Sequence, residues 1–204
     1  MSYFVTGGTG FIGQNLIRQL LGRRGKIYVL VRPSSLARLE QMKARWGKAA
    51  SRVVPVAGDL TQPLLGVAPA LQEQLAGEVF HVFHLAAVYD LKADAVSQES
   101  ANIEGTANAV RFAEAIGARR FHHVSSIAAA GLYQGTFTEE MFDEATGLDN
   151  PYFRTKHAAE GIVRRDCAVP WRIYRAAVVV GDSTAGEIDK IDGPYYFFEM
   201  IQKL

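Results

Sequence analysis

The sequence predicts an α/β protein with one doubly wound parallel sheet whose two faces are covered by helices. Short runs of β-branched and aromatic residues alternate along the chain with longer stretches of helical apolar period. The strand candidates at residues 26–31 and 171–180 are nearly continuous apolar runs, as in strands that are buried on both faces. The 204 residues, of which 49% are hydrophobic, suit one domain with a substantial core.

The chain opens with a strand candidate, a glycine turn and a helix. Residues 3–6 form the strand, and three glycines follow at intervals of three. Gly7 permits a tight turn, Gly10 lets a pyrophosphate approach the backbone, and Gly13 lets the helix pack closely against the strand. Free N–H groups at the helix start favour an anion, although a glycine turn that binds nothing is the alternative. The predicted dinucleotide-binding residues of this segment are Gly7, Gly10, Phe11, Ile12 and Gly13.

The residue that follows the second strand candidate bears on cofactor choice. An acidic residue there would bind the ribose hydroxyls of NAD. The chain instead has Arg32, beside Ser34 and Ser35, and either serine could cap the helix expected over residues 36–46. A cation and free N–H groups suit a ribose 2′-phosphate, so the sequence favours NADP, with a solvated arginine as the alternative.

Two further strand candidates, residues 53–57 and 79–85, end in residues that can face a cofactor. Asp59 follows the first strand and can accept a hydrogen bond from the adenine amino group or cap a turn. The small residues after His84 let the backbone approach the cofactor, and His84 itself is predicted to be packed rather than catalytic. The predicted cofactor site therefore gains Asp59, Leu60 and Ala86.

The second half of the chain is predicted to contain a long helix over residues 95–116 and strands at 121–124 and 171–180. Asn102 and Gly105 inside the helix each cost stability relative to alanine. The last residues, 194–204, have the pattern of an amphipathic helix without a stop signal. We therefore expect the substrate-binding region to be truncated or missing.

Ser126, Tyr152 and Lys156 form the candidate catalytic group. Tyr152 and Lys156 are four residues apart behind Pro151, which suits a first helical turn, so they share one helix face. A lysine ammonium stabilises a nearby phenolate and lowers the tyrosine pKa from about 10. Such a tyrosine can give a proton to an oxygen that gains charge. Ser126, at a strand end, can hydrogen-bond the same oxygen, with Ser125 as the alternative.

The motifs resemble those of one enzyme superfamily. Residues 6–13, TGGTGFIG, match the signature of the extended short-chain dehydrogenase/reductases letter for letter, and residues 102–106 match its N-x-x-G-T. Within that superfamily, residues 30–32, 150–156, 171–175 and 180–197 resemble the bacterial fatty acyl-CoA reductases, which act on acyl thioesters.

The resemblance implies a Rossmann fold that binds NADP over residues 1–204, with the substrate-binding region starting within 182–204. It also implies hydride transfer from nicotinamide C4 to the thioester carbonyl of an acyl-CoA, which gives an aldehyde and, after a second hydride, an alcohol. Ser126 and Tyr152 would stabilise the oxyanion, while Lys156 would hold the ribose and tune Tyr152. The alternatives are a reductase or epimerase of a sugar nucleotide or small ketone, and an NADP-binding sensor without turnover.

The composition narrows the expected partners. A net charge of +1 gives no broad electrostatic case for nucleic acid or membrane binding. We find no signal peptide and no apolar run near the ~18 residues of a membrane span, so we expect a cytoplasmic protein. Cys167 is the only cysteine, which excludes an internal disulfide and a cysteine-based metal site. The expected partner is a small-molecule substrate, and a homodimer is left open.

Overall fold

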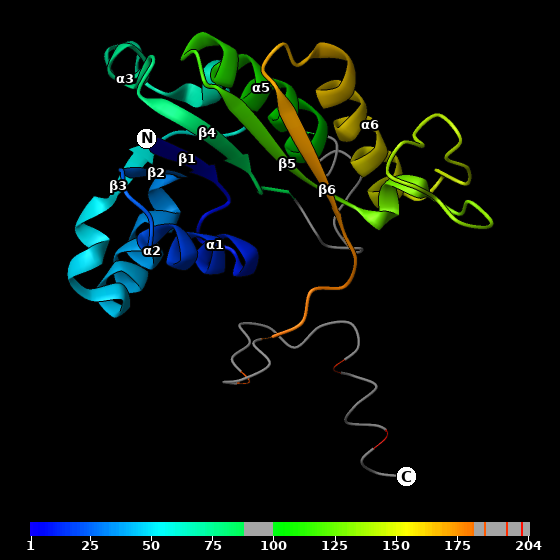
Figure 1. Ribbon diagram of the computed structural model, residues 1–204, viewed down its shortest axis with the longest axis horizontal. Coiled ribbons are helices and arrows are strands. Elements are labelled where there is room, and N and C mark those ends of the chain that lie inside the picture. The colour runs from blue at the N-terminus through cyan, green and yellow to red at the C-terminus, as the bar shows by residue number, and fades with distance from the viewer. Residues whose placement is uncertain (88–99, 182–185, 187–194, 196–200, 202–204) are drawn as a thin grey trace.

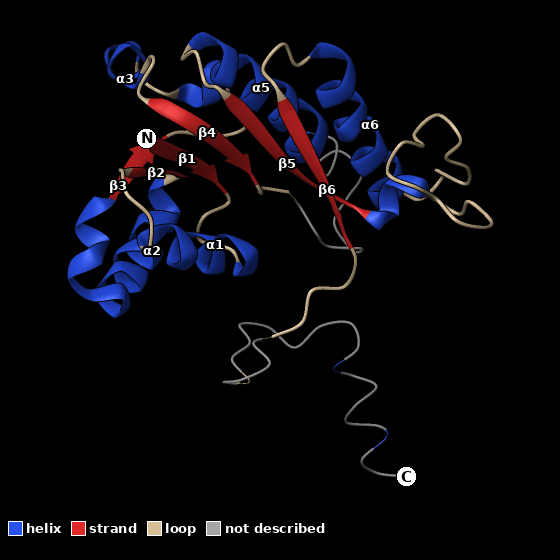
Figure 2. Ribbon diagram, viewed as in Figure 1, coloured by secondary structure: helices blue, strands red, loops and turns tan. Residues whose placement is uncertain are grey.

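The computed structural model describes residues 1–87, 100–181, 186, 195 and 201, and its parallel architecture confirms the predicted fold class (Figure 1, Figure 2). The strands are β1 (Ser2–Thr6), β2 (Ile27–Val31), β3 (Val53–Ala57), β4 (Val79–His84), β5 (Arg120–Ser126) and β6 (Trp171–Ala176). The α-helices are α1 (Phe11–Leu21), α2 (Pro33–Trp46), α3 (Pro69–Leu75), α5 (Gly105–Ala115) and α6 (Pro151–Asp166). All strand pairs are parallel, and helices lie on both sides of the sheet.

Two apolar layers attach the helices to the sheet. Under α3, α5 and α6, the side chains of Phe4, Phe112 and Phe121 are fully buried, and the rings of Phe4 and Phe112 lie 4.6 Å apart. Under α1 and α2 lies the second layer, which contains Tyr3 and Val5. Successive side chains of a strand point to opposite faces, so β1 contributes to both layers. Burying one such side chain contributes about 1.5–3 kcal/mol.

The order of the strands creates the place for a site. The sheet order is β3-β2-β1-β4-β5-β6, so the chain moves outward from β1 and then returns to β4 on the other side of β1. Thr6 and His84 pair in register at the carboxyl ends of these two central strands. In open parallel sheets, ligands bind beyond the carboxyl ends at this point of reversal.

The start of α2 differs from the prediction. Arg32 is the N-cap residue, Pro33 is the first helical residue, and the cap position makes no side-chain hydrogen bond. Neither Ser34 nor Ser35 therefore caps the helix. Proline suits this position because its fixed φ matches the first turn and its missing N–H would have had no helical partner.

The last strand is shorter than predicted. Its ladder with β5 ends where Ser126 pairs with Ala176, so residues 177–180 of the predicted strand lie beyond the ladder. Val178 is 65% exposed, which shows that the apolar run outlasts the hydrogen-bonding partner. The predicted apolar pattern was correct, but β5 sets the end of the strand.

The helix predicted over residues 95–116 is not uniform. A π-helical turn at Ser100–Glu104 precedes α5, and residues 95–99 lie outside the described residues. Most of the predicted helix at 194–204 also lies outside them. Among the helices in the described part of the chain, none is both long and apolar enough to span a bilayer.

Candidate active site

The turn between β1 and α1 is shaped by its glycines. Gly7 has a φ of +69°, and a Cβ there would lie 2.6 Å from the Ala86 backbone nitrogen. A Cβ on Gly13 would lie 2.2 Å from the Gly7 carbonyl oxygen. Gly10, the N-cap of α1, is different, since a Cβ would meet only that oxygen, at 3.3 Å. Packing therefore requires glycine at Gly7 and Gly13, while Gly10 has more open space beside it.

A cavity of about 340 Å³ extends from this turn over the ends of β2 and β3. Arg32 and Ser35 line it on one side, with Asp59 and Leu60 on the other. Asp59 Oδ1 accepts hydrogen bonds from the Thr61 backbone N–H (2.9 Å) and hydroxyl (2.8 Å). The backbone bond is the main reason that the pKa of Asp59 lies below its usual value. The turn-capping role is thus present, and the residue also faces the cavity.

A second cavity, of about 550 Å³, contains the predicted catalytic group. Ser126 reaches it from the end of β5, and Tyr152 and Lys156 reach it from the first two turns of α6. The two cavities share the turn, through Gly7 and Gly10. The structure therefore brings every predicted site residue to the wall of one of two adjoining cavities. The members from both cavities are Gly7, Gly10, Phe11, Ile12, Gly13, Arg32, Asp59, Leu60, Ala86, Ser126, Tyr152 and Lys156.

Local hydrogen bonds fix the start of α6. Asn150 Oδ1 accepts from the backbone N–H of Tyr152 (2.9 Å) and of Phe153 (3.4 Å), and Pro151 occupies the first helical position. Such a cap is worth about 1 kcal/mol. It fixes the backbone of Tyr152, whose side chain is 8% exposed.

The two serines that end β5 have different partners. Ser126 Oγ accepts a hydrogen bond from the Ala128 backbone N–H (3.1 Å), which leaves its O–H free to donate into the cavity. The buried Ser125 donates its hydroxyl proton to Glu160 Oε2 (2.7 Å). This difference favours Ser126 over Ser125 for contact with a substrate oxygen.

Lys156 is almost fully buried, at 4% exposed. Its Nζ donates to the Val124 backbone oxygen (3.0 Å). Burial lowers its pKa to about 8, against the opposing effect of the Glu160 carboxylate. The side chain is therefore mainly cationic at pH 7, in a place where that charge is costly.

A chain of buried polar contacts runs behind the cavities from the glycine turn. The Thr106 hydroxyl donates to the Asn102 backbone oxygen (2.6 Å), so it accepts the Nε2 proton of His84 (3.1 Å). His84 Nδ1 then accepts from the Thr6 hydroxyl (2.8 Å), which accepts the Ala86 N–H (3.3 Å). Burial lowers the pKa of His84 to about 3. His84 is thus a packed, neutral histidine, as predicted.

The same contacts continue to the catalytic helix. Asn102 Nδ2 donates to Thr155 Oγ1 (3.2 Å), and the Thr155 hydroxyl donates to the Tyr152 backbone oxygen (3.2 Å). Sequence reasoning named Thr6 and Thr106 only as members of the two motifs, without their hydrogen-bond partners, and it missed Thr155. The available signal for Thr155 was a polar residue at a position where the helical pattern requires burial.

The described residues offer little for metal or thiol chemistry. They contain no group of three or more His, Cys, Asp or Glu side chains that could hold a metal ion. Cys167 is a half-buried free thiol, and burial raises its pKa.

The sequence is similar to those of several known reductases and peptide synthetases. A family model described as male sterility protein matches residues 5–204. A linear gramicidin synthase of Brevibacillus parabrevis is 35% identical over 92% of this chain, which covers 4% of that protein. The L-2-aminoadipate reductase of Penicillium chrysogenum is 29% identical in its large subunit, with 93% and 15% covered. Fatty acyl-CoA reductase wat of Drosophila melanogaster is 28% identical, with 94% and 46% covered.

Solved structures give the same picture. The terminal R domain from the myxalamid PKS-NRPS biosynthetic pathway superposes with a TM-score of 0.79 at 29% identity, covering 89% of this chain and 50% of that one. The reductase (R) domain of a nonribosomal peptide synthetase from Mycobacterium tuberculosis superposes with a TM-score of 0.76 at 27% identity, covering 90% and 49%. The chain thus spans half or less of the length of each of these relatives.

Proposed function

Because the chain belongs to the male sterility protein family of extended short-chain dehydrogenase/reductases, which are NAD(P)-dependent reductases, we propose that it reduces an acyl thioester with NADPH. The observation that carries this proposal is the pair of adjoining cavities. One has a glycine turn with space for a pyrophosphate, and the other contains Ser126, Tyr152 and Lys156. A protein that only sensed NADP would not need Ser126, Tyr152 and Lys156 together in the second cavity.

The proposed chemistry assigns one task to each side chain. A reduced dinucleotide, when bound, supplies the hydride. The Tyr152 hydroxyl gives its proton to the carbonyl oxygen of the substrate as that oxygen gains negative charge. The Ser126 hydroxyl donates a hydrogen bond to the same oxygen, since the Ala128 N–H already orients Ser126 Oγ. Lys156 keeps a positive charge beside them, which favours loss of the Tyr152 proton.

The product follows from the thioester. Loss of the thiol from the tetrahedral adduct gives an aldehyde, and a second reduction of that aldehyde in the same cavity gives an alcohol. We propose the aldehyde as the first product. The same cavity walls serve both steps.

The preference for NADPH is supported by the end of β2. Arg32 stands where an acidic residue would bind the ribose hydroxyls of NAD, and Arg32 and Ser35 line the cavity of about 340 Å³ beside the glycine turn. A guanidinium pairs well with a phosphate. Asp59 and Leu60 complete the proposed adenine end of that cavity.

Two carriers of the acyl group are supported by different relatives. Acyl-CoA is supported by the fatty acyl-CoA reductase of Drosophila melanogaster. A thioester held on a peptide synthetase is supported by the gramicidin synthase and by the two R domains. Both carriers present a thioester carbonyl, so the roles of the cavity residues are the same for either one.

The remaining expectations form part of the proposal. Residues 1–204 would be the NADP-binding domain, with the substrate-binding region beginning within 182–204. We expect the reductase in the cytoplasm, and light scattering would decide between a monomer and a homodimer.

A turnover screen tests the proposal. The full protein would be given NADPH or NADH with acyl-CoA, with an acyl thioester on a carrier protein, or with a sugar nucleotide, and cofactor oxidation would be followed by absorbance. We expect oxidation of NADPH with a thioester and release of a free thiol. Turnover of the sugar nucleotide alone, or dinucleotide binding without turnover of any substrate, would contradict it.

A further inference from the structure

Glu160 is a charged residue with no role in the proposed chemistry, although it lies one helical turn beyond Lys156. Its side chain is 0% exposed. Carboxylates are almost never fully buried unless they are paired. Its position therefore needs an explanation from its partners.

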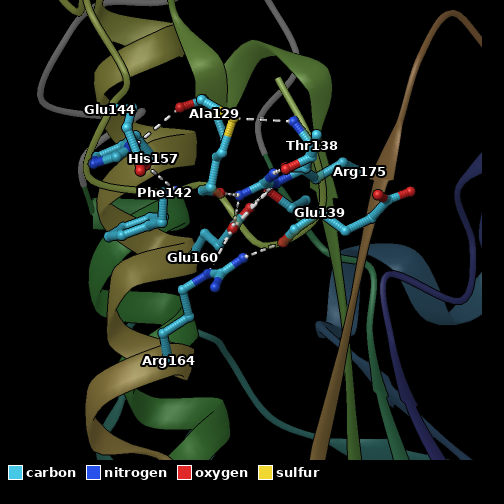
Figure 3. A network of polar contacts seen from close by, with 11 residues as sticks. Ala129, Thr138, Glu139, Phe142, Glu144, His157, Glu160, Arg164 and Arg175 are labelled. Atoms are coloured by element: carbon cyan, nitrogen blue, oxygen red, sulfur yellow. Dashed lines mark hydrogen bonds and ion pairs between the residues drawn. The ribbon is translucent and has the colours of Figure 1, made fainter. Parts of the chain in front are cut away.

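The carboxylate is held by three side chains from three elements (Figure 3). Ser125 Oγ of β5 donates to Oε2 (2.7 Å), and Arg164 Nε of α6 donates to Oε1 (2.9 Å). The Arg175 guanidinium of β6 donates to Oε1 (2.7 Å) and, through Nε, to both oxygens (3.2 Å). Burial alone would raise the pKa of Glu160, but these hydrogen bonds outweigh it and keep the pKa below its usual value. Glu160 is therefore an anion at neutral pH.

Glu160 and Lys156 together hold the end of β5. Lys156 Nζ donates to the Val124 backbone oxygen, and Glu160 accepts from the side chain of the next residue, Ser125. Ser126 follows Ser125 in the chain and lines the cavity of about 550 Å³. Two successive turns of α6 thus fix the strand end that presents the proposed oxyanion donor.

Arg175 extends this arrangement to the segment between β5 and α6. It pairs in register with Ser125 across the β5–β6 ladder, so both side chains point to the face that carries Glu160. Its terminal nitrogens donate to the backbone oxygens of Thr138 (2.8 Å) and Met141. Glu160 is the anion that holds Arg175 in this position, as Figure 3 shows.

The charges around Lys156 are unequal. Glu160 is the anion whose charge raises the Lys156 pKa. On the sheet side lie His84 of β4 and His123 of β5, both buried, and burial keeps both pKa values low, so both are neutral. Tyr152 shares the cavity wall. Arg164 and Arg175 lie beyond Glu160 and partly offset its charge.

We infer that Glu160 is a positioning residue for the reaction, which places a buried anion one helical turn from Lys156 and holds the Val124–Ser126 strand end against the cavity. This inference rests on the proposed function, because that function gives Lys156 and Ser126 their tasks. Glu160 acts through these two residues and does not itself contact the substrate. A carboxylate that did not act on Lys156 would leave the pKa of Lys156 unchanged when its charge was removed.

The test measures that pKa directly, without substrate or dinucleotide. The protein is labelled with ¹³Cε-lysine, the Lys156 signal is identified by its loss in Lys156→Arg, and the signal is titrated from pH 6 to 11. In Glu160→Gln, which keeps the shape of the side chain, the Lys156 pKa should fall by about 1–3 units. The matched control is Glu139→Gln, which removes the same charge from an exposed residue that joins the network only through its backbone oxygen. It should leave the pKa unchanged.

Arg164→Gln provides a second measurement of opposite sign, which decides the matter if Glu160→Gln does not fold. Arg164 is 21% exposed in its side chain, so the fold should tolerate its loss. Removing this cation leaves the Glu160 charge less offset, and the Lys156 pKa should rise by about 0.3–0.5 units. An unchanged pKa in Arg164→Gln, or in a folded Glu160→Gln, would overturn the inference. Because no substrate is used, failure of the thioester proposal would leave this result intact.

Discussion

The two halves of the sheet use different parts of the chain to form the site. The half built on β1–β3 forms its cavity from a glycine turn and strand ends, and among the described residues its buried polar side chains are only Ser2 and Thr6. The half built on β4–β6 is rich in buried polar groups. Those described are His84, Asn102, Thr106, Asn108, His122, His123, Ser125, Thr155, Lys156 and Glu160. The first half therefore surrounds its cavity with backbone and with polar side chains that are not buried, and the second half contains most of the buried polar side chains.

This difference has an energetic consequence. A backbone turn built on glycines costs conformational entropy, but it avoids close contacts and requires few buried polar side chains. Each member of a buried polar network loses its hydration. This loss of free energy is compensated only if every member makes its hydrogen bonds inside the protein. We therefore expect substitutions in the first half to act mainly on binding, and changes in the second half to act on turnover and on stability.

The largest expected effect is on turnover, in the second half. Tyr152→Phe removes one hydroxyl while the ring still packs, so NADPH binding should be kept while turnover falls by about 10²–10⁴-fold. Lys156→Ala should reduce both, because Lys156 is assigned to the cofactor and to Tyr152. Steady-state NADPH oxidation beside a fluorescence titration of NADPH measures the two effects separately. Normal turnover by Tyr152→Phe would remove the main reason for preferring a reductase.

The next effect is on stability in acid. Burial lowers the pKa of His84 to about 3 and of His122 to about 4, and holds that of His123 well below its usual value. The unfolded chain binds these protons near pH 6.5, so the stability is fully present above that pH and is lost as the pH falls toward 4. With about three protons involved, the unfolding free energy should fall by about 4 kcal/mol per pH unit near pH 5.

Urea unfolding at pH 7, 6 and 5 would measure this slope. His123→Leu is a useful control, because both nitrogens of His123 lack a hydrogen-bond partner among the described residues. The variant should be at least as stable at pH 7 and should lose about a third of the slope. Equal stability of the parent at pH 7 and pH 5 would show that the buried histidines do not control its acid sensitivity.

The same contrast explains what could be predicted from the sequence. The glycine turn is a local pattern, and its conformation follows from residues that are adjacent in the chain, so Gly7 could be assigned its role in the tight turn and Gly13 its packing role in advance. The Tyr152 and Lys156 pair was also local, through its helical spacing. The partners of Glu160 come from three elements and are fixed only when β5, β6 and α6 meet, so no local pattern could reveal them.

The ends of two secondary-structure elements also depended on contacts that the local sequence does not show. The end of β6 depends on where β5 stops pairing, at Ser126, and not on the apolar run at 171–180. The start of α2 depends on Pro33, whose preference for the first helical position outweighed the capping preference of the two serines after it. The apolar period therefore did not determine where these two elements end or begin. The neighbouring strand set the end of β6, and the proline set the start of α2.

A third prediction separates two glycines of the first half. Gly13→Val should lower the unfolding free energy by about 1–3 kcal/mol, because its Cβ would lie 2.2 Å from a backbone oxygen. Gly10→Val meets that oxygen only at 3.3 Å, so it should stay folded but weaken NADPH binding at least about tenfold, or about 1.4 kcal/mol. Thermal unfolding and fluorescence titration measure the pair. Unchanged NADPH affinity in Gly10→Val would show that this turn is not the pyrophosphate cradle.

The smallest expected effect concerns cofactor choice at Arg32. Arg32 is exposed, so its pairing with a 2′-phosphate is screened by solvent, and Arg32→Asp should weaken NADPH binding by only about tenfold. The fold should not suffer, because Arg32 is the N-cap of α2 and aspartate is a good N-cap residue. The new carboxylate could instead accept hydrogen bonds from ribose hydroxyls, so the ratio of NADPH to NADH affinity should move toward NADH.

The control is Arg38→Asp, which makes the same charge change nearly two turns further along α2, outside the residues that line the cavity. It should change the ratio much less. Fluorescence titrations with both dinucleotides at two salt concentrations would separate a specific phosphate contact from general charge. The parent and Arg38→Asp should both lose NADPH preference as salt rises, whereas Arg32→Asp should show little change. Equal affinities of the parent for NADPH and NADH would contradict the assignment of Arg32. The half of the sheet built on β1–β3 would then bind either dinucleotide without distinguishing the 2′-phosphate of NADPH.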